Sequence, residues 1–174
     1  MRVLDRLALY GVLMMTLGSV GQAKRSELHL KLSDENHQTL SMDGALQLAI
    51  SIENVGDRPI RIYNKLLRGY AGGVVFRVTD DNGKEVVPES LDDDLIPPPE
   101  PTSPANERFV TLYPGHLWGR VEQVRLSELV KRPGVYHLTC MYKSPLPKTL
   151  GHGPNFWSSE RPPLQSNRLD FTVR

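Results

Sequence analysis

The sequence predicts an all-β protein, a single antiparallel β-sandwich of about seven to nine short strands. Apolar and polar residues alternate with a period of two in a series of short segments, as they do in half-buried strands. Turn-forming residues separate these segments, and no convincing long helix follows the first 23 residues. No internal repeat and no linker divides the rest of the chain, so we expect one domain over residues 24–174.

The segment Gly134–Tyr142 alternates most clearly and is expected to form a central strand. One face is apolar and aromatic, and we assign it to the core: Tyr136, Leu138, Cys140 and Tyr142. The opposite face comprises Val135, His137, Thr139 and Met141. The pattern therefore places the single cysteine in the core, where a thiol is inert.

The other alternating segments are, in chain order, 27–33, 45–54, 60–64, 74–79, 84–87, 108–112, 117–126 and 168–174. Asn82 followed by Gly83 is a hairpin signal and joins the fourth of these segments to the fifth. Residues 65–73 combine two leucines with glycines and stay ambiguous between an edge covering and a loop. Ser127 is placed to cap one helical turn over residues 127–131.

The first 23 residues have the pattern of a secretory signal peptide. Arg2 and Arg6 flank an apolar run at 7–20, which is too short to span a membrane. Small residues at Gly21 and Ala23 suit cleavage after position 23. We therefore expect an exported protein, periplasmic or secreted, with no stable membrane insertion after cleavage.

The mature chain is expected to carry no net charge, because cleavage removes two of the 21 basic residues and one of the 20 acidic residues. A balanced charge argues against nucleic acid as a partner. An exported domain with a single cysteine has no intramolecular disulfide. Its stability has to come from an apolar core, and a chain of this length is sufficient to build one.

Two proline-rich stretches, 88–107 and 143–167, interrupt the pattern of strands. The second would join the last two strands, a position where sandwich domains often place a binding loop. It carries the residues that we expect to form a partner-binding surface: His152, Phe156, Trp157 and Arg161. The alternative, which the sequence leaves open, is that both aromatic side chains fold back and cover the open end of the sandwich.

The sequence offers no catalytic, cofactor-binding or metal-binding motif. Its five histidines lack the close spacing of zinc ligands: His29, His37, His116, His137 and His152. The acidic run at 92–94 lacks the ligand spacing of a calcium loop. Cys140 and His137 are three residues apart on one strand, so they point to opposite faces and cannot act as nucleophile and base. We expect no catalytic residue, no cofactor and no metal.

Several turn and strand signatures have the order found in a known family. They are Asn54 with the following residues 57–62, the hairpin 74–87 (VVFRVTDDNGKEVV), residues 112–115 (LYPG) and residues 133–138 (PGVYHL). Together they resemble the BsuPI-type proteinase-inhibitor fold and related bacterial immunoglobulin-like domains, over residues 45–142. The resemblance implies an immunoglobulin-like sandwich. The proline-rich stretches depart from the family pattern, so no inhibitory residue is carried over.

The function expected from these observations is that of an exported, non-catalytic immunoglobulin-like domain. It would have a binding or structural role towards a protein or glycan partner. One alternative is a proteinase inhibitor that acts through a proline-rich loop. A further alternative is an enzyme of unknown type.

Overall fold

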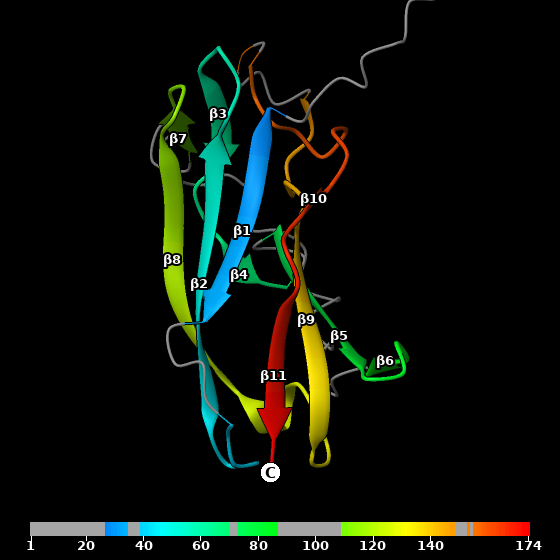
Figure 1. Cartoon of the computed structure of the whole chain (residues 1–174). Helices are drawn as coiled ribbons and strands as arrows, with labels where there is room; N and C mark the ends of the chain where they lie inside the picture. The colour runs from blue at the N-terminus through cyan, green and yellow to red at the C-terminus, as the bar shows by residue number, and fades with distance from the viewer. Residues whose placement is uncertain (1–26, 35–38, 70–72, 87–108, 149–152, 154) are drawn as a thin grey trace, which may run out of the picture.

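A computed structural model describes residues 27–34, 39–69, 73–86, 109–148, 153 and 155–174 (Figure 1). Regular structure in this part of the chain is almost entirely β, as the sequence predicts. None of the described residues belongs to a helix long and apolar enough to cross a membrane. The predicted signal peptide, the proline-rich stretch 88–107 and His152 lie outside the described residues.

Three antiparallel strands form the first sheet, in the order β1–β2–β8. They are β1 (Leu28–Asp34), β2 (Ala45–Asn54) and β8 (Leu117–Arg125). The predicted alternation is confirmed on the central strand, β2, whose inward side chains are fully buried: Leu46, Leu48, Ile50 and Ile52. This arrangement leaves β1 at one edge of the sheet and β8 at the other.

Strand β9 (Gly134–Tyr142) is central in the larger sheet, as its sequence predicts. One edge of β9 pairs with β5 (Gly73–Asp80), and its other edge pairs with β10 (Leu164–Gln165) and β11 (Leu169–Val173). Two short strands pair with β5 and complete the sheet. They are β4 (Leu67–Arg68), which is parallel to β5, and β6 (Glu85–Val86), which closes the predicted hairpin.

A third, small sheet pairs β3 (Ile60–Tyr63) with β7 (Phe109–Leu112). Residues 155–157 attach to the other edge of β3. The Arg61 N–H donates to the Asn155 carbonyl at 2.9 Å, and the Trp157 N–H donates to the Arg61 carbonyl at 2.9 Å. Part of the predicted loop 143–167 is therefore held to a strand through its main chain.

Side chains from all three sheets bury one large apolar cluster. A smaller cluster lies beside it and contains Tyr63, Phe109, Leu146 and Phe156. Where β2 ends, the fully buried Asn54 side chain donates to the carbonyls of Arg58 and Leu112, both at 2.8 Å, and accepts from the Gly56 N–H at 3.0 Å. This amide ties the turn after β2 to the end of β7.

The prediction that Ser127 caps a helical turn is wrong. The turn is a 3₁₀ helix at Leu126–Glu128, which starts one residue earlier and has no side-chain cap. Leu126 is fully buried, and its N–H donates to the Gly44 carbonyl at 3.0 Å. Burial of this leucine and its main-chain bond fix where the turn begins, so a serine hydroxyl has no role in starting it.

Candidate functional site

Strand β1 is an edge strand, and its free edge carries unpaired main-chain groups. The Asn167 side chain shows which residues face this edge. It accepts a hydrogen bond from the Leu32 N–H at 2.9 Å and donates one to the Leu32 carbonyl at 2.8 Å. Because main-chain groups alternate in direction along a strand, Leu30 points its N–H and carbonyl to the same edge. No partner for these two groups occurs in the described parts of the chain.

The Asn167 side chain thus takes the place of the N–H and carbonyl that one residue of an antiparallel neighbouring strand would present to Leu32. A carboxamide offers a carbonyl acceptor and an N–H donor on the same side, whereas a strand supplies these two groups from the two trans peptide groups that flank one residue. At Leu32 the edge of β1 is already paired in this way. At Leu30 the N–H and carbonyl have no partner in the described structure, although the residue as a whole exposes only 4% of its surface.

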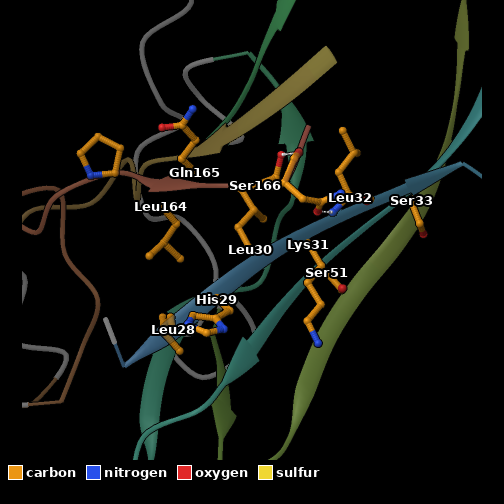
Figure 2. A pocket seen from close by; sticks show the side chains of 12 residues that line it. Leu28, His29, Leu30, Lys31, Leu32, Ser33, Ser51, Leu164, Gln165 and Ser166 are labelled. Atoms are coloured by element: carbon orange, nitrogen blue, oxygen red, sulfur yellow. Dashed lines mark hydrogen bonds between the residues drawn. The ribbon is translucent and has the colours of Figure 1, made fainter. Parts of the chain in front are cut away.

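Strand β10 and its neighbours form the opposite side of this region. The Ser166 N–H donates to the Cys140 carbonyl at 2.9 Å, so Ser166 faces β9 and the main chain of Gln165 faces away from it. Strands β1 and β10 approach within 8 Å, Cα to Cα, but form no ladder. They run in the same direction, since Leu164 lies towards the start of β1 and Ser166 towards Leu32 (Figure 2).

A groove of about 750 Å³ follows β1 between these two sides (Figure 2). Leu30 and Leu164 provide apolar surface within it, while His29, Lys31 and Gln165 provide polar groups. Its volume falls in the range of typical ligand sites. The lining includes every residue from position 28 to 33, so the groove follows nearly the whole length of β1. This shape suits an extended ligand better than a compact one.

The β1 side of the groove carries little net charge. The Lys31 ammonium pairs with the Glu53 carboxylate on the neighbouring strand. The hydrogen bond and the positive charge of Lys31 lower the pKa of Glu53, and His29 contributes a smaller effect in the same direction. Lys31 is exposed and Glu53 is partly exposed to solvent, so the pair adds little to stability. The Glu53 carboxylate balances the positive charge that Lys31 brings to the groove.

The two aromatic residues of the predicted partner-binding surface are not exposed. Phe156 and Trp157 each expose only 4% of their surface. Phe156 packs edge-on against Phe109, with 5.3 Å between ring centroids, and Trp157 belongs to the main core. The structure therefore shows the second of the two arrangements that the sequence left open. Both rings fold back and are packed in the core. In this conformation neither ring is available to a partner.

Arg161 is exposed, and its guanidinium lies over the Trp157 ring at 5.3 Å from the centroid. A small cavity of about 190 Å³ beside these two residues also borders Arg58. The indole N–H of Trp157 is buried and has no hydrogen-bond partner in the described structure. Because that nitrogen is inaccessible from outside, a ligand in the cavity would not reach it. Of the described members of the predicted surface, Phe156 and Trp157 are thus packed in the core, and Arg161 is exposed.

Cys140 and His137 lie on opposite faces of β9, as the alternation predicts. Cys140 is fully buried, and burial raises the pKa of its thiol to about 12. On the outer face, Nδ1 of His137 lies 2.8 Å from Asp170, whose pKa this hydrogen bond lowers. Nε2 of His137 is 4.0 Å from Asp81. Within the described ranges, no three His, Cys, Asp or Glu side chains come together as metal ligands.

The sequence did not predict the groove. The stretch 143–167 does contribute to it, but through residues 163–167 and not through the aromatic residues. The alternation in segment 27–33 marks a strand without showing that this strand lies at an edge. Asn167 looks like an ordinary loop residue until the fold brings it beside Leu32.

Comparisons with known proteins do not assign the chain to a group, since no protein-family model and no curated protein matches it. The functional argument therefore depends on the groove itself. Its distinctive chemical groups are the open N–H and carbonyl of Leu30.

Proposed function

We propose that this protein is an exported, non-catalytic binding module that takes an extended segment of another protein as an added strand on β1. Strand addition to an exposed sheet edge is a common mode of peptide recognition. Main-chain hydrogen bonds supply the affinity in this mode, and alternate side chains supply the specificity. The open edge at Leu30 offers the hydrogen bonds, and the groove offers room for the side chains.

The observation that carries this proposal is the pair of hydrogen bonds between Asn167 and Leu32. They show that the edge-facing N–H and carbonyl of a β1 residue can both be paired by a donor and an acceptor from outside the sheet. An extended polypeptide presents an N–H and a carbonyl to one edge at every second residue. A glycan has no repeated main-chain amide, which makes it the weaker candidate for this edge.

The spacing of the two strands defines how the segment lies. Two strand spacings require about 9.5 Å, and β10 is within 8 Å of β1. The added strand therefore pairs with β1 alone, and this pairing requires β10 to move outward from β1.

The immunoglobulin-like fold and the export of the protein belong to the same proposal. The hydroxyl of Tyr136 donates to the Arg132 carbonyl, four residues upstream, at 2.8 Å. A hydrogen bond of this kind, the tyrosine corner, is a hallmark of immunoglobulin-like sandwiches, so it supports that assignment. Export is supported by the pattern of the first 23 residues alone.

A proteinase inhibitor remains the alternative that the family resemblance implies. Such a role would need an exposed loop. In the described part of residues 143–167, Phe156 and Trp157 are buried and the main chain is bonded to β3. The open edge of β1 is the better-supported site.

Amide hydrogen exchange measured by NMR tests strand addition residue by residue. The probe is a short peptide in which valine and threonine alternate, with both termini blocked. We expect saturation with this peptide to slow exchange of the Leu30 amide by about tenfold or more. The amides of His29 and Lys31 are internal controls, since both already pair with β2 and should change little.

Asn167→Ala provides the matched variant, because it frees the paired groups of Leu32 while removing an exposed side chain. A peptide long enough to pair with both leucines should bind this variant about two- to tenfold more tightly, as expected for one or two added hydrogen bonds. Gln165→Ala, which leaves the main chain intact, should not change the affinity. If extended peptides leave Leu30 exchange unchanged in both the wild type and Asn167→Ala, the proposal is wrong.

A further inference from the structure

A second cavity lies beside the groove, on the other side of Pro163. Its volume is about 340 Å³, and Pro163 lines both it and the groove. Its lining is mainly apolar, with Val75, Met141 and Pro145 among its members. Val75 and Met141 are cross-strand partners on β5 and β9, on the outer face of the larger sheet. We name this space the Met141 cavity.

One cationic group borders the Met141 cavity. Lys143 is exposed, and its main-chain N–H is used by a hydrogen bond to the Gly73 carbonyl at 2.8 Å. Its ammonium group has no carboxylate partner among the residues that the structure describes. An apolar cavity with an unpaired lysine at its rim is complementary to an apolar group that carries a negative charge.

The direction of the groove determines which end of a bound strand reaches this cavity. Asn167 bonds to Leu32 near one end of the groove, and Leu164, which follows Pro163 in the chain, lies near the start of β1 at the other end (Figure 2). The strand β1 therefore runs from the end beside Leu164, next to Pro163, to the end where Leu32 bonds to Asn167 (Figure 2). Antiparallel pairing is somewhat more stable per residue than parallel pairing. An added strand that is antiparallel to β1 places its C-terminal end at Pro163.

From these observations, and resting on the strand addition proposed above, we infer that the partner is recognised by its C-terminus. The last residue of the bound segment passes over Pro163 and places an apolar side chain in the Met141 cavity. Its terminal carboxylate pairs with Lys143. The ligand class is thus a free C-terminal tail with alternating apolar residues and an apolar final residue.

Peptide titrations followed by calorimetry test this inference against its alternatives. The probes are peptides of alternating threonine and valine that end in leucine, either as the free acid or as the C-terminal amide. We expect the free acid to bind about two- to fivefold more tightly, as for an exposed ion pair. Replacing the final leucine with glycine should weaken binding about tenfold or more, since the cavity then stays unfilled.

Two variants separate the two contacts. Lys143→Gln should remove the difference between acid and amide, while Met141→Gln should reduce the effect of the final leucine. Both residues lie at the surface or on the outer face, away from the Leu30 edge, so the Leu30 exchange assay provides the control for strand addition. If peptides protect Leu30 but acid, amide and glycine forms bind equally well, C-terminal recognition is excluded while strand addition stands. If no peptide protects Leu30, both proposals fail together.

Discussion

Asn54 shows how one buried polar side chain can organise a turn. Its amide satisfies three main-chain groups, two of them beyond the end of its own strand. Water cannot replace the side chain easily, because Asn54 is fully buried. An unsatisfied buried polar group costs free energy comparable to that of a lost hydrogen bond. This asparagine therefore contributes to stability and to the path of the chain between β2 and β3.

Replacement of Asn54 by alanine should lower the free energy of unfolding by about 2–4 kcal/mol, because the Gly56 N–H and the carbonyls of Arg58 and Leu112 lose their partner. Urea titration followed by circular dichroism measures this change. Asn54→Asp keeps the size of the side chain but cannot donate when ionised, so it should be at least as damaging at neutral pH. Wild-type stability in either variant would contradict this account.

At the scale of elements, the long strands were predictable because each buries one face. The alternation of segment 45–54 specifies β2, and that of Gly134–Tyr142 specifies β9. Turn residues supply the boundaries, as with the hairpin between β5 and β6. A strand of eight or more residues contains enough alternation for the period of two to be evident.

The shortest elements could not be predicted, because they contain too little alternation. β4 and β10 contain two residues each, too few for any period to appear. Their pairing is decided by neighbouring strands that the sequence does not place beside them. Ser127 fits a capping pattern, yet the burial of Leu126 overrides it.

Strands β9 and β11 are joined on their outer face by the pair His137 and Asp170, which are directly opposite in the ladder. The hydrogen bond from His137 holds the pKa of Asp170 below its ordinary value of 3.8. A carboxyl group whose pKa is lower in the folded state than in the unfolded state stabilises the protein at pH values above the unfolded-state pKa. That stabilising contribution is lost as the pH falls through the lowered pKa of the folded state.

We expect the wild type to exceed Asp170→Asn in stability at pH 5 by no more than about 1 kcal/mol, because the carboxylate is largely exposed. The difference should disappear progressively below about pH 4. Urea midpoints measured across this range provide the comparison. Asp81→Asn is the matched control, since Asp81 is 4.0 Å from the same ring and should show a smaller effect. A difference that grows in acid would show that the pair is not stabilising.

At the scale of the whole molecule, the candidate site depends on which edges meet. The groove forms because β1 ends the first sheet beside the β9 edge that carries β10. Sequence alternation predicts the faces of strands but not their lateral order. For that reason the core residues of β9 were predicted correctly, whereas the groove was not. Trp157 illustrates the same limit, because a large aromatic residue in a loop suits either a contact surface or a core.

The burial of Cys140 makes this single thiol a reporter of how often the whole molecule opens. Thiol reagents attack the thiolate, which is scarce at pH 8 when the pKa of the buried group is about 12. Labelling then requires that the core around β9 separates first, so the labelling rate measures the population of open molecules. If that opening is global, Asn54→Ala should accelerate labelling about 30- to 1,000-fold, in proportion to its loss of stability. A peptide bound in the groove should slow labelling, so one thiol can record both the folding equilibrium and its coupling to a ligand.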